Sequence, residues 1–503
     1  RSVNKQHNLN VSAGWEAASG TTESTNAHYR GFPSGEFHSL NYAAEVYKKP
    51  TRTENTTRRV SVLASANYTW NDIYLVDASV RFDGSSEFGA NQKWAPFFSG
   101  GLGVNIHNYD FFKSNGYINK LKLRASYGRT GKVNFPAYAA TTMYETLFDE
   151  WYITGYGAVL KALGNKDLTW EKTDKLSVGI ETKTFHDRLT VDFEYYYNKT
   201  IDLVNDVTLS QTSGFSTYKD NMGQVANKGV ELKLRADIYR DRNWNVALWG
   251  NMAHNKNEIL KISDSQKAYN ERVAAYYKNE ALYQETLGLS HGAEYSVPLP
   301  QYEEGASLTS IWAVRSLGID PTTGKEIFLN RDGSIADKWN AAQEVVVGNT
   351  EPKCSGAFGL NLSYKNWTLF ASFLYEWGGQ EYNQTLVNNV ENADLVNKNV
   401  DLRVLTDRWK KPGDIAQFKD IKDRGMTTLP TSRFVQDKAL VRLNSLNVSY
   451  DFNRDWIKKH LRMNLLRLEA STSDLINWSS IKQERGLSYP RSWKVEFSLK
   501  AQF

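Results

Sequence analysis

The chain closes on the stretch SWKVEFSLKAQF, residues 492–503, in which every second residue is apolar. Strict alternation of this kind places one class of side chain on each face of a β-strand. In a packed sandwich the apolar face would meet a core, whereas in a membrane barrel it would meet lipid and the polar face a wet lumen. If the chain is a barrel, Lys494, Glu496 and Lys500 face the lumen. The lipid-facing set is then Trp493, Val495, Phe497, Leu499, Ala501 and Phe503.

The same alternation recurs along the whole chain. Its clearest interior case lies at 230–238, where apolar residues alternate with Glu231, Lys233, Arg235 and Asp237. Further alternating segments occupy 9–16, 62–70, 74–82, 121–127 and 189–198. A soluble sheet tolerates this pattern with the charges outward and a barrel with the charges inward, so the strands alone leave both folds open.

The lengths of the connections between these segments distinguish a soluble sheet from a membrane barrel. Short links at 69–72, 186–188, 240–243 and 365–367 alternate with long segments at about 18–57, 131–169, 257–352 and 379–438. Short turns at one end and long loops at the other are typical of an up-and-down outer-membrane barrel. We therefore predict an all-β, antiparallel transmembrane barrel wall of about 14 strands, each of roughly 9–14 residues, with periplasmic turns and extracellular loops.

Bulk composition excludes several other classes of protein. The 503 residues contain no run of ~18 apolar residues, which excludes a helical membrane span. The net charge of +5 is spread without a basic block, so nucleic-acid binding has no support. One Cys and 8 His form no disulfide framework or metal-binding spacing. No paired-carboxylate, Ser-His-Asp or Cys-His arrangement predicts an enzyme, and no catalytic residue is assigned.

Aromatic residues support a membrane barrel, since many of them fall near the ends of the alternating segments. A girdle at the lipid headgroups would place Trp and Tyr there. The alternative is that these residues are good strand formers that bury well. The set consists of Trp15, Trp70, Tyr74, Trp244, Trp367, Trp377, Tyr450, Phe452 and Trp493.

Several longer stretches resemble one family. They are SVRFDGSSEFGANQKWAPFFSGGLGVNI at 79–106, LKLRASYGRTG at 121–131, LGNKDLTWEKTDKLSVGIE at 163–181, DNMGQVANKGVELKL at 220–234, LGIDPTTGKEIFLNRDGS at 317–334 and DRWKKPGD at 407–414. Together they resemble the barrel of SusC-like TonB-dependent transporters. These are outer-membrane nutrient importers of the Bacteroidetes, and they include RagA-like peptide importers. The terminal aromatic Phe503 resembles the signal read by the barrel assembly machinery.

The resemblance implies more than these residues contain. SusC-like transporters have a 22-stranded barrel filled by an N-terminal plug with a TonB-contacting box, whereas residues 1–503 carry about 14 strands and nothing that reads as a plug. The start of the chain lacks an initiator Met and an apolar signal region. We therefore expect 1–503 to be the C-terminal portion of a barrel, with the plug and the remaining strands in a separate or cleaved chain. An unpaired sheet edge cannot face lipid, so the alternative is closure of about 14 strands on themselves.

The implied function is TonB-dependent import of an oligomeric nutrient, a glycan or a peptide, across the bacterial outer membrane. The implied partners are a SusD-like surface lipoprotein lid, the TonB complex acting through the plug, and outer-membrane lipid. Two alternatives remain at this point: a passive porin of about 14 strands, and a soluble or surface-attached glycan-binding β-protein.

Aromatic loop residues are the candidates for substrate contact, because aromatic faces stack on sugars and on apolar peptide side chains. The alternative is that they pack the loops against each other or against the lid. The candidates are Trp151, Tyr152, Tyr156, Tyr375, Trp377 and Tyr382.

No cofactor is expected. Four carboxylates in turn-rich segments, Asp83, Glu87, Asp320 and Asp332, are possible calcium ligands, because oxygen-rich loops can hold that ion. Their spacing lacks the EF-hand pattern, and Asp-Gly and Asp-Pro steps favour turns, so turn chemistry is the preferred interpretation.

Overall fold

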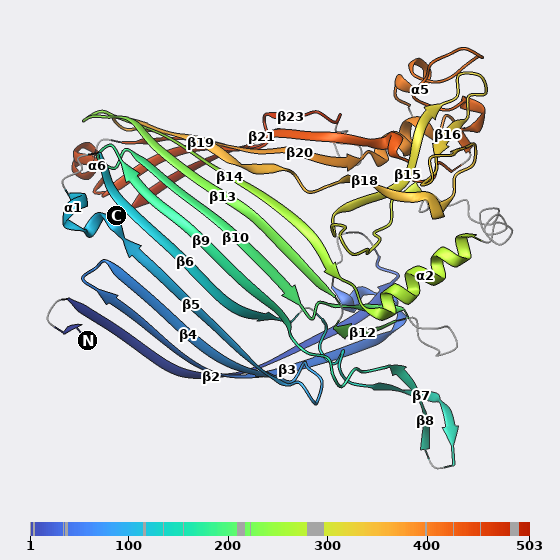
Figure 1. The fold of residues 1–503 in the computed structure, drawn as a ribbon, viewed down its shortest axis with the longest axis horizontal. Helices are drawn as coiled ribbons and strands as arrows, with labels where there is room; N and C mark the ends of the chain where they lie inside the picture. The colour runs from blue at the N-terminus through green and yellow to red at the C-terminus, as the bar shows by residue number, and fades with distance from the viewer. Residues whose placement is uncertain are drawn as a thin grey trace.

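One large antiparallel sheet dominates the protein and curves around its long axis (Figure 1). The computed structural model describes residues 2–3, 6–33, 35, 39–113, 117–133, 135–153, 155–208, 217–221, 223–278, 296–397, 400–425, 427–452, 454–482 and 492–502. The strands of the sheet, in spatial order, are β1 (Ser2–Val3), β2 (His7–Arg30), β3 (Glu45–Trp70), β4 (Tyr74–Ser85), β5 (Trp94–Asn105), β6 (Ile118–Lys132), β9 (Glu171–Thr184), β10 (Leu189–Ile201), β13 (Gln224–Arg240), β14 (Trp244–Lys261), β19 (Cys354–Tyr364), β20 (Trp367–Tyr382), β21 (Val435–Asp451), β22 (Leu465–Thr472) and β24 (Val495–Gln502).

The predicted fold class is confirmed. Without the two-residue β1, this path contains 14 strands, and every pairing along it is antiparallel between neighbours. The short β23 (Asn477–Ser479) pairs with β21 beside the path. Among the described residues, β24 pairs with β22 alone and no pairing joins it to β2, so the path is open at both ends.

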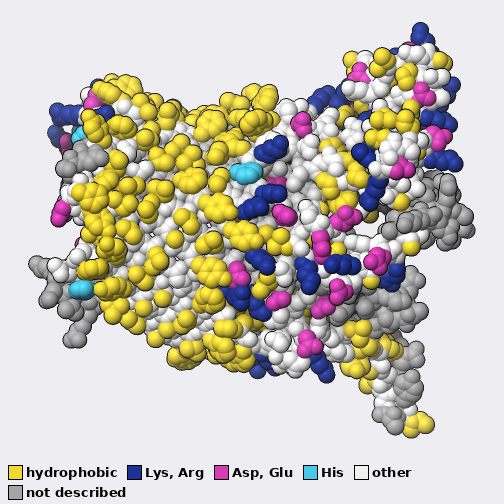
Figure 2. All heavy atoms as spheres, viewed as in Figure 1, with side chains coloured by type: hydrophobic (Ala, Val, Ile, Leu, Met, Phe, Trp, Pro, Cys, Tyr) yellow, Lys and Arg dark blue, Asp and Glu magenta, His cyan; other side chains and the backbone are white. Residues whose placement is uncertain are grey.

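Strand register gives the sheet one apolar and one polar face. Residues directly opposite each other in neighbouring strands share a face. One row of such partners, from β2 to β13, runs through Leu9, Tyr68, Val76, Leu102, Ala125, Val178, Tyr195 and Val230. Figure 2 shows this face as a broad hydrophobic band. We call it the outer face and the opposite one the inner face.

The C-terminal strand obeys the same register. Phe497 and Leu499 lie opposite Ala470 and Leu468 and are 76% and 67% exposed. Val495 lies on the same face, and Trp493 just precedes the strand. Their exposure to lipid stays a prediction. Phe503 lies outside the described residues.

The two ends of the sheet differ as the connection lengths predict. At the left of Figure 1 the strands are joined by short turns such as 71–73, 185–188, 241–243 and 365–366. At the same end α1 (Asp110–Lys113) and α6 (Arg454–Leu461) lie in slightly longer links. The long connections gather at the right, where the candidate site must be sought.

The predicted strand lengths are wrong for several strands. The observed strands range from 8 residues in β24 to 26 in β3, and β2 and β3 pair far into the segment 18–57 that was expected to be a loop. This extension is rich in Thr, a strong strand former, and Thr21 and Thr56 hydrogen-bond across it at 3.1 Å. Backbone pairing therefore continues where the apolar alternation ends, so the apolar pattern marks the outer band rather than the full strand.

An aromatic rim follows the short-turn end of the outer face. Trp244 contacts Tyr364 at 4.3 Å between ring centroids, and Trp367 contacts Tyr450 at 4.8 Å. Trp70 stacks on Tyr74 at 5.3 Å further along the rim. This is the position that a headgroup girdle requires.

The long connections form small folded units of their own. They contain β7 (Met143–Tyr152), β8 (Gly155–Ala162), β11 (Val204–Thr208), β12 (Thr217–Asn221), α2 (Asp264–Lys278), β15 (Ser310–Ile319), β16 (Glu326–Leu329), β17 (Ile335–Ala336), β18 (Glu344–Asn349), α4 (Gln384–Leu386) and α5 (Arg403–Thr406). Strands β15 to β18 form a four-stranded sheet, whereas β7–β8 and β11–β12 are separate hairpins. No helix in the described part of the chain has the length and apolarity that crossing a membrane requires.

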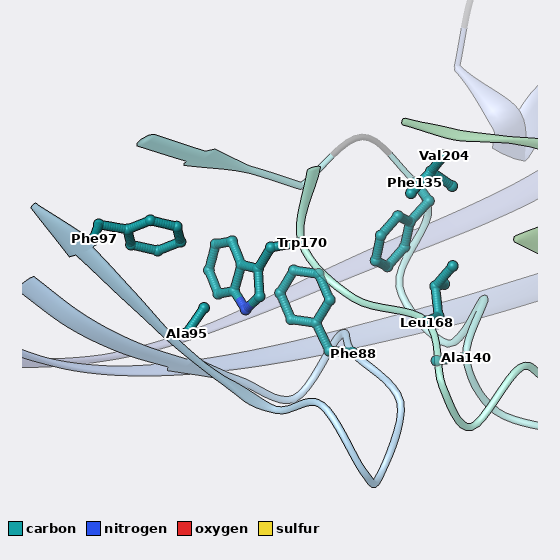
Figure 3. Close-up of a cluster of buried hydrophobic side chains, with 8 residues drawn as sticks. All are labelled: Phe88, Ala95, Phe97, Phe135, Ala140, Leu168, Trp170 and Val204. Carbon is teal, nitrogen blue, oxygen red and sulfur yellow. The ribbon is translucent and has the colours of Figure 1, made fainter. Parts of the chain in front are cut away.

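A buried aromatic cluster fixes two of these connections to the wall (Figure 3). Trp170 stacks on Phe88 at 4.2 Å and meets Phe97 edge-on at 5.3 Å. The Gly89 amide donates to the Leu168 carbonyl at 3.0 Å, and a Cβ on Gly89 would lie 2.0 Å from the Lys166 carbonyl oxygen. The stretches SSEFG and LGNKDLTW therefore pack on each other, which gives both motifs a structural role.

Candidate functional site

The inner face carries a row of polar side chains that is interrupted by one glycine. From β2 to β14 successive cross-strand partners are Ser12, Ser65, Ser79, Ser99, Gly128, Lys175, Asn198, Asn227 and Asn257. Ser12 and Ser65 hydrogen-bond at 2.7 Å, and Ser79 and Ser99 at 2.6 Å. Hydroxyl and amide groups both donate and accept, so this surface suits water and polar solutes.

The row passes through a hollow of about 540 Å³ on β6, β9, β10, β13 and β14. The Tyr196 hydroxyl donates to Asn255 Oδ1 at 3.0 Å. Gly229 allows this close approach, because a Cβ there would lie 2.7 Å from the tyrosine oxygen. Ser126, Ser177, Lys175, Asn198, Asn227, Glu194 and Glu231 complete the polar lining. The hollow therefore presents hydroxyls, amides and charges of both signs at one place.

Charged side chains on the inner face are mostly paired. Arg124 donates to Asp192 at 2.9 Å and to Glu194 at 2.6 Å, each about a third exposed or less. Lys120 contacts Glu181 at 2.6 Å. Partly hydrated pairs of this kind contribute little stability. Their effect is to hold the side chains along the wall.

An amide network joins the inner face to the long connections. Asn227 Oδ1 accepts from Asn257 at 2.9 Å and from Asn255 at 3.2 Å. Asn257 Oδ1 in turn accepts from the Leu308 amide at 2.8 Å and the Ser307 hydroxyl at 3.1 Å. Side chains of the wall thus position the segment that precedes β15.

A second hollow, of about 950 Å³, lies between β14 and β20 above the point where β19 begins at Cys354. Its lining includes Asn255 and Asn257 from the inner face and His254 and Lys256 from the outer face. It therefore reaches both faces of the wall at its long-loop end.

Above it, a buried ion cluster stabilises the loops. Arg433 contacts Glu391 at 2.7 Å and Glu326 at 2.9 Å, and the Glu391 side chain is fully buried. Burial lowers the pKa of Arg433, but the two carboxylates more than offset this effect, so the pKa is raised. Arg433 stays charged and connects the 383–434 connection to β16.

The predicted substrate residues are not brought together. Tyr375 and Trp377 follow Phe373 at alternate positions of β20, opposite Gly356 and Cys354, on the outer face. Trp377 is 69% exposed there, which favours the girdle interpretation for this residue. Tyr382 packs edge-on against Phe434 at 6.0 Å in a loop core, as the packing alternative predicts.

The other three candidates lie in the β7–β8 hairpin. Tyr156 is 52% exposed and pairs with position 151 across the hairpin. The side chains of Trp151 and Tyr152 lie outside the described residues. The inner-face amides Asn198, Asn227, Asn255 and Asn257 were not predicted as site residues, although strand alternation places Asn198 on the face opposite Tyr195 and Tyr197.

Of the four carboxylates considered as calcium ligands, Glu87, Asp320 and Asp332 lie at turns. Asp83 lies inside β4 opposite Ala95, so the turn predicted at Asp83 and Gly84 is wrong. Asp320 accepts from the Thr322 amide at 2.8 Å and the Thr323 hydroxyl at 2.7 Å, and Asp332 accepts from Ser334 in the same way. Asp83 pairs with Arg81 at 2.5 Å. Glu87 accepts from the Ser85 hydroxyl at 3.1 Å. The bonds of Glu87, Asp320 and Asp332 are the turn chemistry that the sequence favours. Within the described ranges no three metal-binding side chains converge.

Comparison with known proteins places this wall in a family. Residues 1–465 match the family described as TonB dependent receptor-like, beta-barrel. The chain belongs to this family. TonB-dependent receptor P3 of Formosa agariphila is 28% identical over 485 residues, which cover 94% of this chain and 46% of that protein. TonB-dependent receptor SusC of Bacteroides thetaiotaomicron is 29% identical over 255 residues, 48% of this chain and 25% of that protein.

Solved structures share the fold. The RagAB peptide importer in its open-open state matches with a TM-score of 0.81 and 23% identity over 100% of this chain and 53% of that one. A further RagAB peptide transporter structure matches with a TM-score of 0.77, 23% identity, and coverage of 96% and 51%. The chain spans about half the length, or less, of the curated relatives it matches.

The family assignment confirms two predictions. The resemblance to SusC-like and RagA-like TonB-dependent transporters is confirmed, and so is location in the bacterial outer membrane. The family is one of transporters and receptors.

Proposed function

We propose that this chain forms most of the barrel wall and the extracellular loops of an energised importer of an oligomeric nutrient, either a glycan or a peptide. The observation that carries the proposal is the polar inner face with its hollow at Tyr196 and Asn255. Glycans and peptide backbones both require closely spaced donors and acceptors, and the serine and asparagine row supplies them. The names of the RagAB neighbours give the peptide as one option.

The proposed assembly needs further parts. A plug and additional strands, from a preceding segment or another chain, would pair with the open edges of the sheet and couple it to TonB. A SusD-like lipoprotein would cover the long loops. Exposed apolar side chains in the 383–434 connection support such a contact, since exposed apolar patches mark interaction sites. They are Val396, Leu402, Leu405 and Ile415, exposed by 83%, 71%, 60% and 96%.

The test is uptake of labelled oligopeptides and oligosaccharides by cells that produce the full transporter. We expect one class to enter, and uptake to stop when a protonophore collapses the proton gradient. Uptake that persists without the gradient would favour the passive pore instead. Mass spectrometry of the proteins that co-purify in detergent should then reveal plug sequence and a lipoprotein.

A matched pair of variants on β13 links uptake to the inner face. Asn227→Leu removes the amide that bridges Asn255 and Asn257, and we expect uptake to fall about tenfold. Val230→Leu, on the outer face of the same strand, is the control and should leave uptake unchanged. Equal uptake by both variants would show that the hollow is not part of the substrate path.

A further inference from the structure

Lysines mark the edge of the outer apolar band nearest the long loops. On β10 the outer-face residues run from Phe193 through Tyr195 and Tyr197 to Lys199, and on β13 Val230 is followed by Lys228. Figure 2 shows Lys and Arg side chains gathered along this edge of the band. Apolar, aromatic and then basic residues are the order expected from the hydrocarbon to the headgroups.

The spacing agrees with a membrane boundary. Lys228 and Tyr239, which lies at the short-turn rim, are eleven positions apart on β13. At ~3.3 Å per residue and a tilt of ~45° they span about 26 Å of thickness, close to the ~25 Å apolar band of outer-membrane barrels. The lysines therefore lie level with the headgroups of the leaflet on the long-loop side.

Two of these lysines form a cross-strand pair of like charges. Lys228 and Lys256 lie directly opposite each other on β13 and β14, where like charges destabilise a sheet. Lys199 is the diagonal neighbour of Lys228, and His254 occupies the other diagonal. We call Lys199, Lys228, Lys256 and His254 the outer basic patch.

Acidic side chains on this face do not neutralise the patch. Asp174, opposite Lys199, already receives two bonds from Arg129, at 2.6 and 2.8 Å. Glu258 lies 3.6 Å from Lys256, whose side chain is 60% exposed. Within the part of the chain that the structure describes, Lys228 forms no ion pair. An excess of positive charge remains.

The patch also has room for a ligand. His254 and Lys256 line the hollow of about 950 Å³, together with the exposed Trp377. The hollow thus opens beside the patch at headgroup level, with an aromatic side chain on its margin.

We propose that the outer basic patch binds the phosphate of a phosphorylated glycolipid headgroup in the outer leaflet. Direct and diagonal neighbours on a sheet lie about 5 to 8 Å apart at Cβ, so the flexible lysine side chains of the patch can bring their ammonium groups around one phosphate. The phosphate offsets the repulsion between Lys228 and Lys256, and the band below it holds the acyl chains. The lipid then fixes the height of the barrel in the membrane.

Native mass spectrometry of the purified full assembly tests the proposal, with diphosphoryl lipid A as the probe. Each lysine near an anionic headgroup strengthens binding about fivefold, so Lys228→Gln with Lys256→Gln should weaken lipid A binding about 30-fold. Lys233→Gln, on the inner face of β13, is the matched control and should bind as the wild type does. Dephosphorylated lipid A should bind every variant as weakly as the double variant binds lipid A.

Thermal unfolding separates binding from folding. In neutral detergent without phosphate the double variant should melt at or above the wild-type temperature, because a repulsive pair is gone. Lipid A should raise the melting temperature of the wild type and not that of the double variant.

Equal lipid A affinity in both proteins would overturn the proposal. So would a wild type that prefers inorganic phosphate to lipid A. Lys199→Gln, which leaves the cross-strand pair intact, should weaken binding about fivefold and gives a second reading if the double variant fails to fold.

Discussion

Glu344, the first residue of β18, has a carboxyl group largely withdrawn from water in the loop sheet. Burial raises its pKa to about 7, although the amide of Gln301 and the charge of Arg331 act in the opposite direction. The folded state therefore holds this proton more tightly than the unfolded state does. The cost of burying the carboxyl is absent below about pH 4.5, grows as the pH rises toward 7, and is constant above it.

Glu344→Gln should therefore stabilise the loop sheet at high pH. An amide keeps an acceptor for Gln301 and carries no charge to bury. We expect a gain of about 3 kcal/mol at most at pH 8, shrinking to nearly zero at pH 4.5. Thermal unfolding at both pH values measures it, with the exposed Glu303→Gln as control. A gain of the same size at both pH values would contradict the assigned pKa.

Individual residues show which side-chain orientations can be predicted from the sequence. Alternation assigned Val230 and Glu231 to opposite faces, and register confirms it, because the period of a strand is two. The same rule would have placed Tyr375 and Trp377 on the outer face with Phe373. They were chosen as substrate residues for their aromatic character, which does not show the face of the strand on which a side chain lies. Loop packing was the stated alternative for Tyr382, but its partner Phe434, more than 50 residues away, could not be identified from the sequence.

At the scale of elements, the cluster around Trp170 decides whether the connection between β6 and β9 stays attached to the wall. Trp170 is 4% exposed and contacts two aromatic rings from β5 and the loop before it. Trp170→Ala removes both contacts and leaves a cavity, at a cost of about 3–5 kcal/mol.

We expect Trp170→Ala to free residues 135–168 while the strands remain paired. Hydrogen exchange read by mass spectrometry should accelerate in peptides of this connection and stay slow in β9. Trp94→Ala is the control, because Trp94 is 51% exposed and stacks on one ring, Phe82, at 5.3 Å. Comparable exchange in the two variants would show that the cluster does not hold the connection.

Element boundaries were harder to predict than element identity. The turns at 71–73 and 241–243 fall where the short links were expected, since Asn and Asp readily adopt the left-handed backbone at Asn71 and Asp72. The outer ends of β2 and β3 were missed because their pairing depends on backbone bonds and Thr propensity, which leave no apolar pattern. The small sheet β15–β18 was missed because its core forms only when distant segments meet.

At the scale of the whole molecule, the sheet ends in two strands with exposed side chains on both faces. All eight residues of β24 are exposed, and β2 is exposed along nearly its whole length. A backbone edge in lipid costs several kcal/mol for each unpaired group, so both edges need partners in the membrane. The proposed partners are further strands of the same barrel.

We expect slow hydrogen exchange in β24 of the full assembly. If a further strand pairs with its free edge, the amides of 495–502 should exchange as slowly as those of the central strand β13 when the assembly is held in a lipid nanodisc. Peptides from the exposed turn at 331–334 should exchange fast and serve as the reference. The same chain purified without partners should lose protection in β24 first, because only β22 then holds it. Fast exchange of β24 in the intact assembly would mean that the edge is unpaired, and the barrel would then have to close in another way.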